Sequence, residues 1–348
     1  MWYPYAVHTQ TDLEIDAPLE SIAAYLTANG LGTGELRIEP IGNGHSNLSF
    51  VLIQPDRKLV LRRPPRPPFP PSAHDVLREA RIIAALRPAG MPVPEVLAFC
   101  DDDSVLGVPF YVMEYVDGAV LDTDVPAGLS EADAAAIGDE FIAGMVKLHS
   151  LAPELAGLGP AQRADSYLSR QIERFTVIWG AVKTRTIPAM DEIETWLRER
   201  LPTNTERAIV HGDYRLGNTI FDLADEPRLA AVLDWEMAAL GDPLADLGYM
   251  LATWVEAGDP ETAMSSLSRV TRAPGFPTRA RLRSDYERLS GRSTEGIDYY
   301  QVLALWKSAA FLESSYRRHI EGRAPDPYFA RLKEGVPEIA QRALSLTG

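Results

Sequence analysis

Three polar side chains in the middle of the sequence have types and spacing suited to phosphate chemistry. Asp213 and Asn218 lie in the segment HGDYRLGN (211–218), which is flanked by two short apolar runs. Asp234 ends a third apolar run, sixteen residues after Asn218. Short apolar runs bounded by polar residues are typical of strands. We therefore expect the three side chains on loops at the ends of neighbouring strands.

Phosphoryl transfer uses a set of this kind. One carboxylate accepts or orients the proton of the attacking hydroxyl, while a carboxamide and a second carboxylate supply hard oxygen ligands to Mg²⁺. A turn with capping aspartates would explain the HGD triplet alone. Asn218 and Asp234 follow the triplet at the positions that such a site requires. The interpretation of Asp213 as a catalytic residue is therefore favoured over a simple turn.

Composition narrows the possible partners. The chain has 348 residues, 46% hydrophobic and 24% charged, and a formal net charge of −15. This sign argues against nucleic-acid or anionic-membrane binding, because both need a basic surface. The lone Cys100 excludes an internal disulfide and a cysteine zinc site. With no apolar run of about 18 residues and no leader-like start, we expect a cytoplasmic protein. The oligomeric state is not predicted.

The first third of the chain is predicted to be rich in strands and the remainder in helices. A helix opened by a capping box at Ser72 and running to Arg87 follows the third strand. The expected strands of this part are 36–41, 48–53, 59–63, 96–99 and 109–114. After 117–118 the expected helices are 130–149, 166–180, 190–200, 243–257, 260–270, 279–289 and 297–320. A small β island over 208–210, 219–222 and 229–233 interrupts these helices.

The segment GNGHSN (42–47) separates the first two expected strands. Gly42 and Gly44 would let backbone N–H groups approach phosphate oxygens, and Ser46 or Asn47 would add side-chain donors. A Gly-rich hairpin turn explains the segment equally well. The segment has neither a Walker A lysine nor a strand-to-helix context, which excludes a P-loop or a Rossmann site.

These motifs together resemble the aminoglycoside phosphotransferase family, part of the wider protein-kinase-like fold. The spacing of Asp213 and Asn218 matches the kinase catalytic loop, with HGD in place of HRD. The resemblance covers about residues 30–320. It is closest to the phosphotransferase domains attached to some acyl-CoA dehydrogenases, which share GNGHSN, VLRRPP (60–65), SAH (72–74) and FYVME (110–114).

The resemblance implies an α+β, bilobal protein-kinase-like fold. Its N-lobe would hold an antiparallel five-stranded sheet with one helix, and its C-lobe would be mainly helical with a small β-hairpin. Residues 1–116 would form the nucleotide-binding lobe and residues 117–348 the catalytic and substrate-binding lobe. ATP or GTP would bind between the two lobes.

The resemblance also assigns roles in the C-lobe. Asp213 would be the catalytic base, and Asn218 and Asp234 would bind Mg²⁺. Asp246 would buttress the catalytic loop from the following helix. His211 is interpreted as a hydrogen-bonded anchor of that loop, because Asp213 already fills the role of the base.

In the N-lobe, Arg62 aligns with the lysine that kinases use to hold the α- and β-phosphates. Strand alternation places Lys58, Val60 and Arg62 on one face, and Arg63 is interpreted as a solvated edge arginine. Glu79 lies on the apolar stripe of its helix, where an unpaired charge would be costly. Arg62 is its expected partner. A solvated Arg62 and an exposed Glu79 are the alternatives.

The segment Met113-Glu114-Tyr115-Val116 lies at the expected boundary between the lobes. In kinase-like folds this connector offers backbone hydrogen bonds to the adenine edge, and apolar side chains enclose the ring. A purely structural role is equally compatible with these residues. A second open question is whether the aromatic residues of the last predicted helix line the acceptor pocket or only pack: Tyr299, Tyr300, Trp306, Tyr316 and His319.

The sequence thus predicts a phosphotransferase that uses ATP or GTP with Mg²⁺ and phosphorylates a hydroxyl of a small molecule. An acceptor of the hydroxy acid or hydroxyacyl thioester type is favoured over an aminoglycoside. An inactive nucleotide-binding pseudokinase is the alternative, because Arg62 replaces the lysine and the third glycine of the kinase loop is absent. A protein kinase is disfavoured, because no Ala-Pro-Glu segment follows Asp234.

Overall fold

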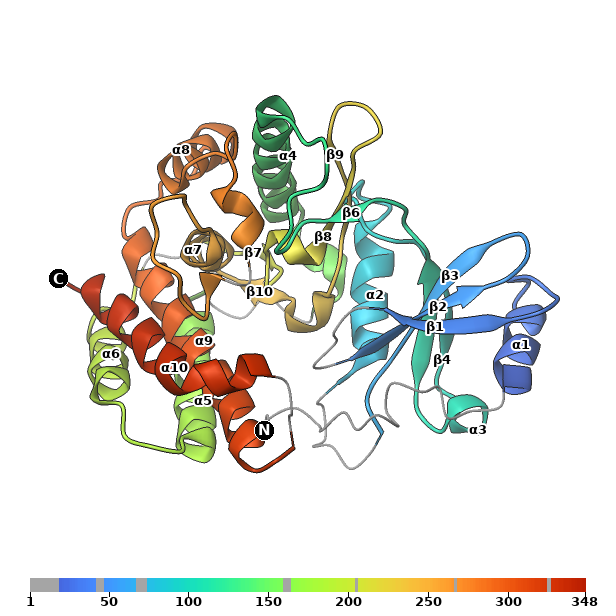
Figure 1. Ribbon diagram of the computed structural model, residues 1–348, viewed down its shortest axis with the longest axis horizontal. Helices are drawn as coiled ribbons and strands as arrows, with labels where there is room; N and C mark the ends of the chain where they lie inside the picture. The colour runs from blue at the N-terminus through green and yellow to red at the C-terminus, as the bar shows by residue number, and fades with distance from the viewer. Residues whose placement is uncertain are drawn as a thin grey trace. The chain divides into compact units, whose positions relative to one another are not determined.

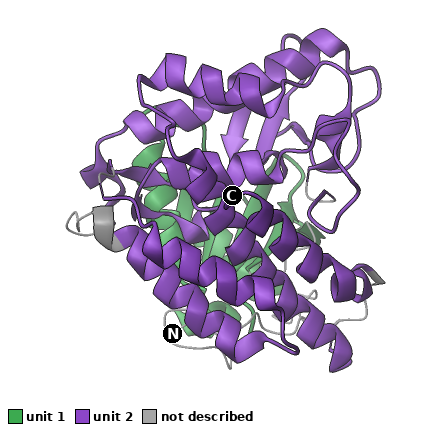
Figure 2. Ribbon diagram, turned by 90° about the vertical axis from the view of Figure 1, so that its left-hand side faces the viewer, with its two compact units in different colours: residues 1–116 green, residues 117–348 purple. Residues whose placement is uncertain are grey.

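A computed structural model describes residues 19–41, 47–66, 74–158, 164–203, 206–265, 268–323 and 327–348. The chain forms two compact units, residues 1–116 and 117–348, which Figure 2 shows in different colours. The first unit is built on an antiparallel sheet, and the second is mainly helical. The predicted α+β class is therefore confirmed.

The first unit contains a five-stranded sheet in the order β1-β2-β3-β5-β4 (Figure 1). All four pairings are antiparallel. One face carries large apolar side chains that pack in a buried cluster with Ile22 and Leu26. The other face carries Arg62. The strands are β1 (Arg37–Ile41), β2 (Leu48–Ile53), β3 (Lys58–Arg63), β4 (Val96–Cys100) and β5 (Phe110–Glu114).

Three helices accompany this sheet. Two of them, α1 (Leu19–Ala28) and the short α3 (Asp103–Leu106), were not predicted. The predicted start of α2 (Val76–Leu86) at Ser72 is wrong, because Asp75 caps this helix by accepting a hydrogen bond from the Arg78 amide at 2.9 Å. The preceding His74 has a left-handed backbone (φ 60°), which is incompatible with a helix. Ser72 lies outside the described residues.

The second unit is organised around α9, which packs against α5, α6, α7 and α10 (Figure 1). This helix has buried residues on most of its surface, as a central helix must. The predicted capping box of α4 is present, with Ser130 and Asp133 bonded reciprocally. The helices are α4 (Glu131–Ser150), α5 (Ala164–Val182), α6 (Pro188–Glu199), α7 (Leu244–Thr253), α8 (Arg279–Ser290), α9 (Ile297–Ile320) and α10 (Pro327–Ser345).

One predicted helix of this unit is wrong. Over 260–270 the described residues form turns, and a short 3₁₀ helix covers Arg269–Arg272. The side chains of Thr262 and Ser265 accept hydrogen bonds from each other's amides at 3.2 and 3.0 Å. Such local bonds compete with the helical backbone pattern. Helix α10, in contrast, was not predicted.

Two small sheets interrupt the helices of the second unit. The predicted hairpin is present as β8 (Thr219–Asp222) and β9 (Arg228–Val232), and β6 (Ala119–Val120) extends it. In the other sheet β7 (Ala208–Val210) pairs with β10 (Ala239–Gly241). Segment 211–218 therefore runs from β7 to β8. Within the described ranges, no helix combines the length and apolar character needed to cross a bilayer.

Candidate active site

Asp246 anchors the start of the 211–218 loop. It lies in the first turn of α7 and is fully buried. Its Oδ2 accepts a hydrogen bond from the His211 amide at 2.7 Å, and its Oδ1 accepts one from the Gly212 amide at 2.8 Å. His149 of α4 donates from Nε2 to Oδ2 at 3.2 Å. Burial opposes ionisation of Asp246, but hydrogen bonding and positive charge from His149 hold its pKa below the usual value.

The His211 ring connects the loop with the segment that carries Asp234. The Leu233 carbonyl can only accept, so Nε2 of His211 donates to it at 2.8 Å. The Asp213 amide can only donate, so Nδ1 accepts from it at 3.2 Å. The ring is therefore in the neutral tautomer with its proton on Nε2. Both nitrogens are occupied by structural hydrogen bonds.

Asp213 and Asn218 lie in direct contact. The Asn218 Nδ2 donates to Asp213 Oδ2 at 2.8 Å and to the Asp213 carbonyl at 2.9 Å. This contact fixes the orientation of the amide, with its nitrogen toward Asp213. No described residue donates a hydrogen bond to Oδ1 of Asn218. The Asp213 side chain is 29% exposed, so it is accessible to a substrate.

Asp234 has an unusual backbone conformation. Its φ and ψ are 65° and 64°, in the left-handed region, two residues after the end of β9. The amide of the preceding Leu233 donates to the Asn218 carbonyl at 2.8 Å, which ties this segment to the 211–218 loop. A residue other than glycine in this region costs about 1–3 kcal/mol, and such residues cluster at functional sites.

Arg215 is a site residue to which the sequence assigned no role. Its Nε lies 3.7 Å from Asp213 Oδ1, and its Nη1 lies 3.6 Å from Asp122 Oδ1. Burial lowers the pKa of this guanidinium, but Asp213, Asp122 and Asp234 outweigh it and raise the pKa. A Cβ on Gly217 would collide with Nη1 of Arg215. The arginine therefore lies between the carboxylates of Asp213 and Asp122.

In the first unit, the expected pair of Arg62 and Glu79 is present. The Arg62 Nε lies 3.0 Å from Glu79 Oε2, and the side chains are 12% and 1% exposed. Arg62 also donates to Ser49 Oγ at 3.2 Å, and Asn47 donates to Glu79 Oε2 at 3.4 Å. Both alternatives, a solvated Arg62 and an exposed Glu79, are therefore wrong. Gly42, Gly44 and Ser46 lie outside the described residues.

The interpretation of Arg63 as a solvated arginine is also wrong. This residue is 2% exposed. Its guanidinium donates to the Pro64 carbonyl at 2.9 Å and lies over the Phe50 ring, 5.4 Å from the centroid. Its long aliphatic stem continues the apolar face of the sheet, so the side chain is accommodated inside the unit.

The connector residues have mixed environments. Met113 is 8% exposed and lies opposite Val60 in the β3–β5 register, and Val116 is half-buried. The Glu114 side chain forms an ion pair with Arg87 at 3.0 Å. The Glu114 amide is also bonded, since it donates to the Glu95 carbonyl at 2.8 Å.

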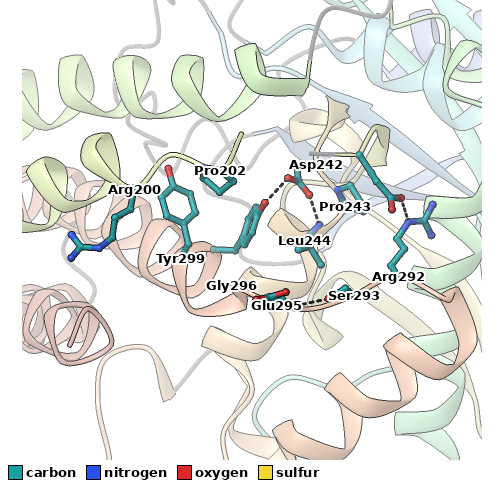
Figure 3. A pocket seen from close by; sticks show the side chains of 12 residues that line it. Arg200, Pro202, Asp242, Pro243, Leu244, Arg292, Ser293, Glu295, Gly296 and Tyr299 are labelled. Atoms are coloured by element: carbon teal, nitrogen blue, oxygen red, sulfur yellow. Dashed lines mark hydrogen bonds and ion pairs between the residues drawn. The ribbon is translucent and has the colours of Figure 1, made fainter. Parts of the chain in front are cut away.

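A cavity of about 450 Å³ lies within the second unit, between the end of α6 and the starts of α7 and α9 (Figure 3). Tyr299 and Tyr300 line it, whereas Trp306 is fully buried and donates to the Met190 carbonyl at 3.2 Å. Tyr300 donates to Asp242 Oδ2 at 2.5 Å. Asp242 also accepts from the amide of Leu244, the first residue of α7, at 3.0 Å.

The donor set near the 211–218 loop fits a small hard cation. Asn218 Oδ1 faces away from Asp213, and Asp234 supplies a carboxylate. Mg²⁺ in nucleotide sites is held by one or two protein oxygens together with phosphates and water. No group of three or more His, Cys, Asp or Glu side chains that could bind a metal occurs in the described parts of the chain.

Residues 37–284 match the model of the "Phosphotransferase enzyme family" (APH). The chain is 33% identical over 332 residues to mouse acyl-CoA dehydrogenase family member 10, with 93% of this chain covered. It is 34% identical over 322 residues to chicken acyl-CoA dehydrogenase family member 11, covering 90% of this chain. It spans 31% and 41% of the length of these two relatives.

Among solved structures, a Ralstonia eutropha protein provisionally named an aminoglycoside phosphotransferase superposes with a TM-score of 0.79 and 32% identity. The match covers 95% of this chain and 98% of that protein. A thermostable mutant of the phosphotransferase APH(4)-Ia, in complex with ADP and hygromycin B, superposes with a TM-score of 0.62 and 16% identity. That match covers 94% of this chain and 98% of the other. The predicted protein-kinase-like fold is confirmed.

Proposed function

Because the chain belongs to the phosphotransferase enzyme family (APH), we propose that it transfers the γ-phosphate of ATP or GTP, with Mg²⁺, to a hydroxyl of a small molecule. The observation that carries this proposal is the contact of Asp213 with Asn218, on a loop bonded to the segment that carries Asp234. This arrangement supplies a base and two oxygen ligands from neighbouring loops. Positioning and electrostatics supply most of the catalysis in such a reaction.

In this mechanism Asp213 accepts the proton of the acceptor hydroxyl as the oxygen attacks the γ-phosphorus. The bond from Asn218 holds one carboxylate oxygen in place and leaves Oδ1 for the hydroxyl. Asn218 and Asp234 would hold Mg²⁺, whose positive charge would offset that of the nucleotide phosphates. Arg215 forms an ion pair with Asp213, and Asp246 with His211 fixes the loop. In the first unit Arg62, oriented by Glu79, would contact the phosphates.

The acceptor that we favour is a hydroxy acid or hydroxyacyl thioester. Two relatives, at 33% and 34% identity, carry acyl-CoA dehydrogenase names; the Ralstonia protein with an aminoglycoside phosphotransferase name is 32% identical, and the protein in the hygromycin B complex is 16% identical. An acceptor screen by coupled ADP or GDP release tests the proposal, with hydroxy acids, hydroxyacyl-CoA thioesters, amino alcohols and aminoglycosides. If nucleotide binds but no acceptor stimulates release with ATP or GTP, the pseudokinase alternative replaces the kinase.

Replacing Asp234 with asparagine should weaken Mg²⁺-dependent nucleotide binding by about tenfold or more, because a charged ligand of the cation is lost. Asparagine tolerates the left-handed backbone of this position, so the fold should persist. Calorimetric titration of ATP with and without Mg²⁺ measures the effect. The affinity for Mg²⁺-free ATP should stay unchanged. The matched control is the exposed Asp225→Asn, and equal MgATP affinity in the two variants contradicts the ligand role.

Arg62→Met should raise the KM for nucleotide by about tenfold, because the phosphates lose a bidentate cation. It should also lower the free energy of unfolding by about 3–5 kcal/mol, since Glu79 would remain buried without its main partner. Arg62→Lys keeps the charge, so its KM for nucleotide and its free energy of unfolding should both lie close to the wild-type values. Nucleotide kinetics and urea unfolding of the two variants check this. A wild-type KM in Arg62→Met would rule out phosphate binding by Arg62.

A further inference from the structure

Arg215 lies between two carboxylates without closing on either of them. Its Nε lies 3.7 Å from Oδ1 of Asp213, and its Nη1 lies 3.6 Å from Oδ1 of Asp122. Charge-assisted N–H···O bonds are normally about 2.7–2.9 Å long. Within the described ranges Nη1 is buried and has no hydrogen-bond partner. A short movement of the guanidinium toward either carboxylate would therefore form a direct hydrogen bond.

Asp122 depends on this arginine. It follows β6, and its carbonyl accepts a hydrogen bond from the Val270 amide at 3.1 Å, which fixes its backbone. Its Oδ1 is buried, and no described group donates a hydrogen bond to it. Burial raises the pKa of the Asp122 carboxyl, whereas the positive charge of Arg215 lowers it. A Cβ on Gly217 would meet both the guanidinium and this carboxylate, so the glycine leaves the space that the pair occupies.

The position of Arg215 matters because Oδ1 of Asp213 has two possible partners. Oδ2 of this carboxylate already accepts from Asn218 at 2.8 Å, so Oδ1 is the oxygen left for the acceptor hydroxyl. It is also the oxygen that faces Arg215. A direct hydrogen bond from Nε would occupy Oδ1 and stabilise the anion, which would make Asp213 a poorer proton acceptor. At 3.7 Å the guanidinium leaves this oxygen unoccupied.

We propose that Asp122 is a positioning residue, which draws Arg215 away from Asp213 and so keeps Oδ1 of the base free for the acceptor hydroxyl. This inference rests on the proposed function. The two carboxylates compete for one guanidinium at almost equal distances. They are the acidic groups within 4 Å of it in the described part of the chain. Without the charge of Asp122, the attraction of Asp213 is unopposed at this range, and Arg215 closes on the base.

Asp122→Asn should lower kcat by about tenfold, because the hydroxyl must displace Arg215 from the base. The KM for MgATP should stay within about twofold of wild type, because the proposed cation ligands are untouched. Asp122→Glu keeps the charge and should restore kcat. Asp124→Asn, an exposed aspartate two residues further on, is the matched control. Equal kcat values in Asp122→Asn and Asp124→Asn would overturn the proposal.

A double-mutant cycle separates positioning from a purely structural role. In the Arg215→Gln background no guanidinium can close on Asp213, so adding Asp122→Asn should change kcat by less than about twofold. This comparison holds whatever Arg215→Gln itself costs. The same tenfold loss in both backgrounds would mean that Asp122 does not act through Arg215.

Crystal structures of wild type and Asp122→Asn test the inference without turnover. In the variant, Nε of Arg215 should lie within about 3 Å of Oδ1 of Asp213, whereas the two atoms should remain apart in wild type. A guanidinium at the same position in both crystals contradicts the proposal. If no acceptor turns over, the proposed function fails, and these structures alone decide whether Asp122 holds Arg215 away from Asp213.

Discussion

Asp213→Asn is expected to lower kcat for phosphotransfer by about 10²- to 10⁴-fold, the contribution usual for a positioned general base. Asparagine has nearly the same shape as aspartate, and its oxygen can still accept the hydrogen bond from Asn218 Nδ2. What it lacks is a basic oxygen for the acceptor proton and a negative charge beside Arg215. Coupled ADP release with the acceptor found by the screen measures the loss.

The affinity for nucleotide should show whether Asp213→Asn loses kcat through the missing base or through a disturbed fold. The affinity of Asp213→Asn for MgATP should stay within about threefold of wild type, because the proposed cation ligands are Asn218 and Asp234. Asp222→Asn, an exposed aspartate at the end of β8, is a matched control and should keep full activity. Turnover above about a tenth of the wild-type value in Asp213→Asn would exclude the base role.

The elements of this fold that the sequence predicts well have strong local patterns. Helix α9 begins and ends at the predicted residues, Ile297 and Ile320, because an apolar pattern continues over six turns. Strand β8 and the core of β9 are flanked by turn residues and keep their predicted positions. In contrast, α1, α3 and α10 were missed, and a helix was predicted over 260–270, where side-chain to backbone bonds prevail.

In the candidate site, too, residues close together in the sequence were predicted, and contacts between distant residues were not. Asp213, Asn218 and Asp234 belong to one short stretch, so their spacing indicates a shared site. Their supports come from distant parts of the chain: His149 reaches Asp246 across 97 positions, and Arg215 pairs with Asp122. A single sequence contains no signal for such pairs. The burial of Arg63 was missed for a related reason. Strand alternation predicts which face of the sheet carries Arg63, but it does not predict which residues cover that face.

Asp246→Asn should lower the free energy of unfolding by about 3–5 kcal/mol and disable the enzyme. The carboxylate accepts from the amides of His211 and Gly212 and from His149 Nε2, all in a buried position. An asparagine has one acceptor oxygen, so its NH₂ group would face a donor and leave that donor unsatisfied. Asp298→Asn, in the first turn of α9 but exposed, is the matched control.

The pH dependence gives this prediction its second test. The pKa of Asp246 is lowered in the folded protein, so its stabilisation is fully present above the unfolded pKa, near 4. It is lost as the pH falls through the lower folded value. The stability difference between wild type and Asp246→Asn should therefore narrow below about pH 4. Urea unfolding at each pH measures it. A difference that widens on acidification would mean that Asp246 is protonated in the folded protein and does not hold the loop as an anion.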